Sequence, residues 1–137
     1  MARRVSFAFE RRSSPLFGVV HRPIAVVGLW SKKIQRWAQV VMLVDTGADY
    51  TLLPKVYAAH LGVRLDRDCR VFETMGIGGR ERVYLLKRWP MQLQQWRRDI
   101  PVGFLTRNDV PPLLGRQACL ETFKVTLFRH STTFATR

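Results

Sequence analysis

Asp45 is the residue of this sequence best suited to acid–base chemistry. It begins the tetrapeptide Asp45-Thr46-Gly47-Ala48, directly after a largely apolar run over residues 38–44. A carboxylate held at the end of a strand can act as a general base or a general acid. The same residue types also form ordinary turns, in which the carboxylate accepts hydrogen bonds from backbone amides. The tetrapeptide alone therefore does not decide between catalysis and a turn.

Two further motifs containing glycine follow along the chain. Residues 75–79 read MGIGG between two strand-like stretches, and residues 113–116 read LLGR. Glycines between two strands indicate a hairpin whose tip has unusual backbone freedom, and a plain turn without a moving part is the simpler alternative. A phosphate-binding loop is disfavoured, because GxGxxG requires glycine at position 81, where Glu81 stands, and the sequence has no GK[ST].

Together, the three motifs resemble those of the retropepsin family, the single-domain aspartic proteases typified by retroviral proteases and their cellular relatives. In that family an apolar strand leads into DTGA, a β-hairpin flap carries a glycine-rich tip, and two apolar residues with Gly-Arg begin a short helix. The resemblance covers about residues 23–128. It implies an all-β, retropepsin-like closed barrel, the acid protease fold, with one or two short helices, forming a single domain over residues 1–137.

The resemblance also implies an aspartic endopeptidase that hydrolyses polypeptide substrates without a metal ion or another cofactor. Amide hydrolysis needs a general base to activate water and a general acid to protonate the substrate. Two carboxylates that share one proton supply both, as they do in aspartic proteases. This chain has one DTG, since none of the other five aspartates is followed by Thr-Gly or Ser-Gly. The second carboxylate is therefore expected from Asp45 of another copy, in a homodimer.

Further roles follow from the resemblance, residue by residue. The catalytic loop comprises Asp45, Thr46 and Gly47; the Thr46 hydroxyl is expected to bond across the dimer and the Gly47 carbonyl to meet the substrate backbone. Arg116 is expected to support this loop through a contact with Asp49. Substrate contacts are expected from the loop, the next strand and the flap, namely Gly47, Ala48, Asp49, Leu52, Gly76, Ile77, Gly78 and Gly79. Structural support is expected from Leu113, Leu114, Gly115 and Arg116.

Histidine and cysteine offer no competing catalytic site. The three histidines, His21, His60 and His130, are far apart in the sequence and lack metal-binding spacing such as HExxH. Cys69 and Cys119 are expected to be free thiols, because neither belongs to a CxxC or a Cys/His cluster. The position of Cys119 just after the LLGR motif favours packing over nucleophilic chemistry.

Composition keeps two alternatives to an active protease open. The 137 residues carry 23 Lys and Arg against 10 Asp and Glu, so the net charge of +13 allows a basic nucleic-acid-binding domain. Against this, the arginines are scattered and form no run of five. The other alternative is a catalytically silent module for dimerisation or peptide binding, suggested by the charges of Arg80, Glu81 and Arg82 at the expected flap tip. No apolar stretch approaches the ~20 residues of a membrane-spanning helix and no secretory signal is evident, so a cytoplasmic location is expected.

The segments that must position these residues read mainly as strands. Alternating patterns predict strands near residues 5–9, 24–30, 91–93, 100–104 and 125–127, and a hairpin over 70–74 and 82–87. The run before Asp45 predicts a strand buried on both faces. Pro54 and Gly62 bracket a predicted short helix, and residues 116–121 a helical turn. By the resemblance, residues 5–9 and 132–134 are candidates for a sheet between subunits.

Overall fold

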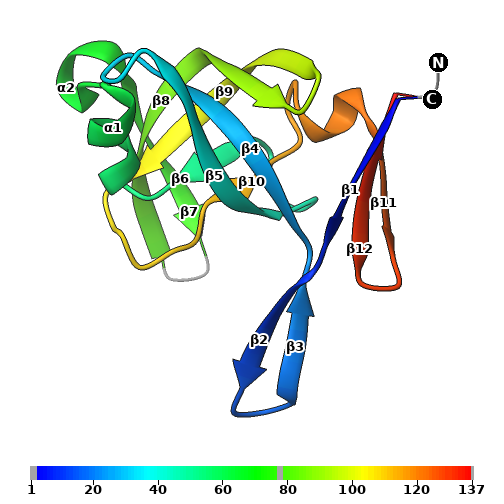
Figure 1. Ribbon diagram of the computed structural model, residues 1–137. Helices are drawn as coiled ribbons and strands as arrows, with labels where there is room; N and C mark the ends of the chain where they lie inside the picture. Colours follow the sequence, from blue (N-terminus) through cyan, green and yellow to red (C-terminus); the bar gives the residue numbers. More distant parts are fainter. Residues whose placement is uncertain (1–2, 77–78, 137) are drawn as a thin grey trace.

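The computed structural model describes residues 3–76 and 79–136 and confirms the predicted all-β class (Figure 1). The largest sheet of the described part has seven strands, listed here in spatial order: β4 (Ile24–Ser31), β5 (Arg36–Val44), β10 (Leu113–Leu114), β6 (Thr51–Leu53), β9 (Trp96–Leu105), β8 (Gly79–Leu93) and β7 (Arg70–Gly76). An additional pairing between β4 and β8 joins this sheet back on itself, through Gly28 with Gln92 and Leu29 with Met91. The strands therefore enclose a common apolar interior.

The interior is filled by aliphatic and aromatic side chains from alternate positions of these strands. Fully buried members include Leu29, Met42, Leu53, Met91, Ile100 and Phe104. Each such side chain contributes roughly 1.5–3 kcal/mol by leaving water. This core fixes the strands whose ends carry the Asp45 and LLGR segments.

Strand β5 differs from the sequence prediction, because only one of its faces is buried. Met42 is fully buried, whereas Val41 is 49% exposed and Leu43 is half-buried. The prediction of burial on both faces is wrong because apolar residues occupy the outer face too, where no layer of secondary structure covers them fully. β5 pairs antiparallel with β4 along its length, and antiparallel strands need only one covered face.

The helices are short, as predicted. Helix α1 (Val56–Leu61) confirms the helix between Pro54 and Gly62, and Gly62 ends it with a left-handed φ of 74° that suits glycine. A second helix, α2 (Leu65–Asp68), has no counterpart in the sequence prediction. The predicted helical turn over residues 116–121 is instead a turn that leads into the 3-10 helix η1 (Leu120–Thr122).

The two ends of the chain form a separate three-stranded sheet, here called the terminal sheet. In spatial order it contains β1 (Arg4–Ala8), β12 (Ser131–Ala135) and β11 (Lys124–Phe128). The Phe134 ring meets Phe7 and Phe123 edge to face with centroids 6.0 and 5.7 Å away, and Phe123 joins the sheet to the body through Trp96 of β9, with ring centroids 5.0 Å apart. The strand predicted near residues 5–9 is therefore confirmed as β1, and within this chain it pairs with β12, which contains residues 132–134.

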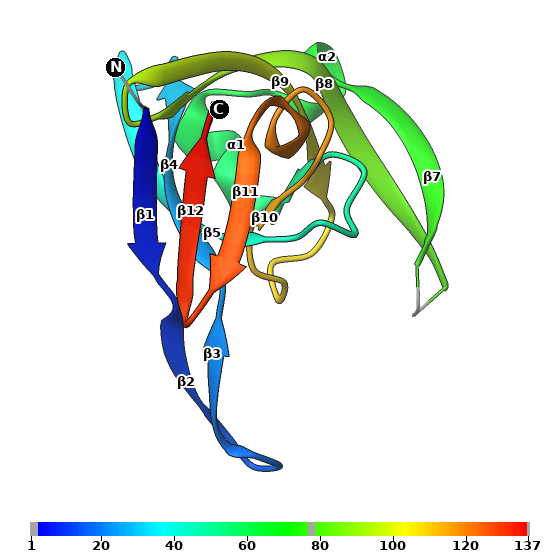
Figure 2. The same ribbon diagram turned by 90° about the vertical axis from the view of Figure 1, so that its right-hand side faces the viewer.

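A two-stranded ribbon, here called the arm, has no counterpart in the sequence prediction. It consists of β2 (Glu10–Ser14) and β3 (Gly18–Arg22), and it extends away from the body in both ribbon views (Figures 1 and 2). Its base is held to the terminal sheet, because the Phe9 amide donates a hydrogen bond of 2.8 Å to the His130 carbonyl oxygen. The rings of His21 and His130 also stack, with centroids 3.9 Å apart.

Across residues 3–76 and 79–136, no helix has the length and apolar character needed to cross a bilayer.

Candidate active site

The Asp45 side chain lies at the start of a loop, residues 45–50, that the neighbouring strand holds in place. Strand β10 pairs in parallel with the end of β5, and the Asp45 amide donates a hydrogen bond of 3.0 Å to the Leu114 carbonyl oxygen. The Asp45 Oδ1 atom accepts a hydrogen bond of 2.9 Å from the Gly47 amide. The carboxylate is half-buried, so it is both oriented by its own loop and accessible to solvent.

Residues 115–117 cross directly beneath this loop. The amide of Arg116 donates to the Ala48 carbonyl oxygen at 3.0 Å, and that of Gln117 donates to the Asp49 carbonyl oxygen at 2.8 Å. At Gly115 the two backbones nearly touch, since a Cβ there would lie 2.2 Å from the Tyr50 carbonyl carbon. Only glycine permits this crossing.

The contact expected between Asp49 and Arg116 is present. Arg116 Nη2 donates to Asp49 Oδ1 at 2.5 Å, and Arg116 Nε reaches the Ala48 carbonyl oxygen at 3.4 Å. The guanidinium thus joins one carboxylate oxygen and one backbone oxygen of the loop, and a two-pronged contact with the carboxylate is not formed. Because both side chains are largely exposed, this ion pair positions the loop more than it stabilises the fold.

The predicted hairpin over the site is formed by β7 and β8, which pair from Arg70 with Leu85 to Gly76 with Gly79. Ile77 and Gly78, which belong to its expected tip, lie outside the described residues. Near its base, Phe72 meets Tyr50 edge to face, with ring centroids 6.4 Å apart. Burial, followed by the Asp49 charge, raises the pKa of Tyr50. Its hydroxyl therefore stays neutral at ordinary pH.

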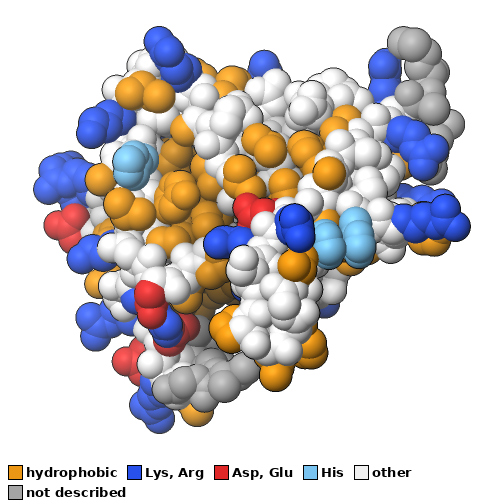
Figure 3. All heavy atoms as spheres, turned by 60° about the horizontal axis from the view of Figure 1, so that its bottom comes forward, with side chains coloured by type: hydrophobic (Ala, Val, Ile, Leu, Met, Phe, Trp, Pro, Cys, Tyr) orange, Lys and Arg blue, Asp and Glu red, His pale blue; other side chains and the backbone are white. Residues whose placement is uncertain are grey.

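Figure 2 shows how the predicted segments come together on one face of the molecule. The loop between β5 and β6 lies between the terminal sheet on one side and the β7–β8 hairpin on the other. With the lower side of Figure 1 brought forward, hydrophobic side chains line a hollow that Lys and Arg side chains surround (Figure 3). Leu52, which follows the loop in β6, is half-buried, and Leu113 and Leu114 lie in β10 between β5 and β6.

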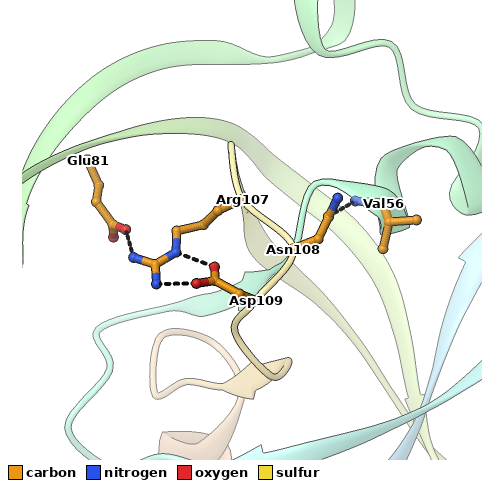
Figure 4. A network of polar contacts seen from close by, with 5 residues as sticks. All are labelled: Val56, Glu81, Arg107, Asn108 and Asp109. Atoms are coloured by element: carbon orange, nitrogen blue, oxygen red, sulfur yellow. Dashed lines mark hydrogen bonds and ion pairs between the residues drawn. The ribbon is translucent and has the colours of Figure 1, made fainter.

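An ionic cluster that sequence reasoning did not find ties the hairpin to the segment after β9 (Figure 4). Arg107 donates from Nη1 to Glu81 Oε1 at 3.0 Å, and from Nε and Nη2 to the two carboxylate oxygens of Asp109 at 2.5 and 2.9 Å. Glu81 belongs to β8, so Arg107 links hairpin and body. The charge of Glu81 at the hairpin was visible in the sequence, but its partner lies 26 residues away and has no local signature.

Replacing Arg107 with Gln is expected to loosen the β7–β8 hairpin without unfolding the protein. The exposed ion pair is worth little to global stability, so backbone amides of β7 and β8 should lose about two- to fivefold of their hydrogen-exchange protection. Arg82→Gln is the control, because Arg82 has no ion-pair partner in the described part of the chain. Equal protection in both variants would contradict the link.

The contact between Arg107 and Asp109, on the body side of this cluster, has a pH dependence that follows from Asp109. The hydrogen bond from Arg107 lowers the pKa of the Asp109 carboxyl. The contact of Arg107 with Asp109 is therefore complete above the ordinary aspartate pKa of about 3.9, and it is lost only as pH falls through the lowered value. Arg107 is expected to stay paired with Asp109 from neutral pH to about pH 5, which an NMR titration of the Asp109 carboxyl checks.

The cysteines and histidines provide no alternative nucleophile or metal centre. Both cysteines are free, and burial is the main cause that raises the pKa of Cys69 to about 11 and that of Cys119 to about 12. Both thiols are therefore protonated at neutral pH, a state in which they are poor nucleophiles. The structure brings His21 and His130 together, although they are distant in sequence. Within residues 3–76 and 79–136, no three His, Cys, Asp or Glu side chains converge as metal ligands would.

Comparison with known proteins adds two likenesses. A family model described as gag-polyprotein putative aspartyl protease matches residues 33–119. The crystal structure of a retropepsin-like aspartic protease from Rickettsia conorii superimposes with a TM-score of 0.66, covering 95% of this chain and 97% of that chain at 17% sequence identity. A comparison with curated proteins gave no match. The matched family range contains the Asp45 loop, the β7–β8 hairpin and the crossing at Gly115.

Proposed function

Because this chain belongs to the family of gag-polyprotein putative aspartyl proteases, we propose that it is an aspartic endopeptidase that hydrolyses peptide bonds in polypeptide substrates. The observation that carries the proposal is the setting of Asp45. Its carboxylate begins a glycine-containing loop at a strand end, is accessible to solvent, and is oriented by the Gly47 amide. A general acid–base residue needs this combination of access and fixed orientation.

The catalytic unit we propose is a homodimer in which two Asp45 carboxylates, one from each subunit, face one another across a water molecule. Two carboxylates that close together cannot both ionise, so they share one proton. The ionised carboxylate takes a proton from the water, whose oxygen forms a bond to the substrate carbonyl carbon. The protonated carboxyl gives its proton to the carbonyl oxygen. Collapse of the tetrahedral intermediate then breaks the C–N bond, and the amine leaves with a proton returned from the pair.

The terminal sheet and the Asp45 loop support an isologous interface around a two-fold axis. Both lie on the face seen in Figure 2, and β11 forms an edge of the terminal sheet with Leu127 and Phe128 exposed. An exposed apolar edge strand is available for pairing with another chain. In such a dimer the Thr46 hydroxyl, exposed on this subunit, would bond to the opposite loop.

Substrate binding is proposed between the Asp45 loop and the β7–β8 hairpin. An extended peptide would be met from below by Gly47, Ala48 and Asp49, with Leu52 contributing apolar surface. From above it would be met by the hairpin tip, whose described members are Gly76 and Gly79. Arg116, Gly115 and the β10 leucines hold the floor of this site through the crossing beneath the loop.

The proposal is tested by digesting a peptide library at several pH values while the oligomeric state is measured by analytical ultracentrifugation. Cleavage by a dimer is expected, with specific activity that falls on dilution as subunits separate. Robust cleavage by a species that sediments only as a monomer would refute the shared site. Peptide binding without cleavage at any pH would refute the protease and favour the catalytically silent module.

A further inference from the structure

A groove of about 180 Å³ lies between the base of the arm and the outer face of β5. Its walls are of two kinds. The apolar walls come mainly from Val41, Leu43, Pro111 and Pro112. The charged rim comes from the arm, through Glu10, Arg12 and Arg22. The groove therefore combines an apolar floor with guanidinium groups on one side.

The floor of this groove lies close in sequence to Asp45, which directly follows the last residue of β5. Side chains alternate along a strand, so Val41 and Leu43 lie on the same face of β5, about 6.5 Å apart, and Asp45 is the second residue after Leu43. Met42, between the first two, points into the core. The Leu43 amide donates to the Pro112 carbonyl oxygen at 2.9 Å, which fixes the proline wall beside the strand end.

The arm is fixed at the same place. The Val44 amide, one residue before Asp45, donates a hydrogen bond of 2.9 Å to the Pro23 carbonyl oxygen. Arg22 is the residue before Pro23, so the main chain ties it to the strand that carries Asp45. The contacts of the arm base with His130 keep it from swinging away.

The charge at the rim is unbalanced. Arg12 Nε pairs with Glu10 Oε1 at 2.8 Å, which offsets the one carboxylate of the groove. Arg22 forms no ion pair with any residue of the described ranges and is exposed. An unpaired guanidinium beside an apolar surface is suited to a carboxylate, since its planar fork of donors matches both carboxylate oxygens.

We propose that the arm groove is a specificity subsite that selects substrates with a bulky apolar side chain and an acidic side chain two residues away. An extended peptide places every second side chain on one side, about 6.5 Å apart, and the apolar floor and Arg22 line the same groove of about 180 Å³. The apolar side chain occupies the floor formed by Val41 and Leu43. The acidic side chain meets Arg22. This inference rests on the proposed protease function and names the substrate class of that site.

The test compares peptide pairs that differ only by Glu or Gln at the acidic position. Wild type is expected to cleave the Glu peptide with a kcat/KM about two- to fivefold higher than the Gln peptide, the range of an exposed ion pair. In Arg22→Gln the ratio should fall to about one, and Arg22→Glu should reverse it. Arg11→Gln is the matched control. Arg11 lies opposite His21 in the β2–β3 register, one position away from Arg12 and Arg22, so its side chain is on the other face of the arm. This variant should keep the wild-type ratio. A ratio unchanged by Arg22→Gln would overturn the subsite.

Binding measurements separate failure of the subsite from failure of the protease. The same peptides, carrying a fluorophore, are titrated against the Asp45→Asn protein and against its double variant with Arg22→Gln. If the Glu peptide binds more tightly than the Gln peptide, and this difference depends on Arg22, the subsite is supported. That holds even if wild type cleaves neither peptide, since the missing cleavage would refute only the protease. If wild type cleaves the Glu and Gln peptides at equal rates, and the Asp45→Asn protein binds them equally tightly, only the subsite is refuted.

Discussion

Asp45→Asn is expected to abolish peptide cleavage while leaving the fold intact. In a homodimer the substitution removes both carboxylates at once, so neither the general base nor the general acid is left. Each such group contributes about 10²–10⁴-fold, and the combined loss should exceed about 10³-fold. The asparagine Oδ1 can still accept the hydrogen bond that the Gly47 amide now donates to Asp45, so the loop should keep its shape.

The measurement is the rate of cleavage of a peptide taken from the library digest, with Asp99→Asn as the control. Asp99 is an exposed aspartate of β9, and its variant should retain wild-type activity. Mixing gives a second readout of the shared site. With a tenfold excess of the Asp45→Asn chain and free exchange of subunits, wild-type activity should fall to about a tenth, because most wild-type subunits then have an inactive partner. Activity that is insensitive to the excess chain would count against a site built from two subunits.

Gly115→Ala is expected to destabilise the protein strongly, and far more than Gly28→Ala. The added Cβ would lie 2.2 Å from the Tyr50 carbonyl carbon and 2.3 Å from its oxygen, and both are backbone atoms. No side-chain rotation relieves such a contact, so the crossing of residues 115–117 beneath the Asp45 loop must open. The free energy of unfolding should fall by about 3 kcal/mol or more, a large part of the stability of a small domain.

Urea denaturation of the wild type and of two glycine variants measures this effect. Gly28→Ala is the matched control, because the nearest atom to its added Cβ is Nε2 of the Gln39 side chain, at 3.3 Å. That flexible amide can move aside, so Gly28→Ala should change the stability by less than about 1 kcal/mol. If the two variants have the same urea midpoint, the close crossing is not what restricts position 115 to glycine. A folded Gly115→Ala protein should also lose cleavage activity, since its Asp45 loop is displaced.

Local patterns were sufficient for the elements around the site. Three patterns each involve only a few neighbouring residues: the apolar run before Asp45, the glycines of the hairpin, and Pro54 with Gly62 at the two ends of a helix. These patterns predicted β5, the β7–β8 hairpin and α1. The contact of Arg116 with Asp49 could not be predicted from a local pattern. It spans 67 residues, and only resemblance to a family supplied it. No periodicity in this sequence connects those two positions.

The sequence by itself determined which residue types could do chemistry and in what order: one aspartate in a DTG motif, a glycine-containing hairpin and the LLGR segment. The tertiary structure alone decided that one face of β5 is open, that Arg107 reaches Glu81, and that the arm lies beside the strand carrying Asp45. The physical reason is that periodicity reports which side of a strand is apolar but not what covers it. Contacts between distant segments depend on how the whole sheet closes, and that is set by the sum of many buried contacts.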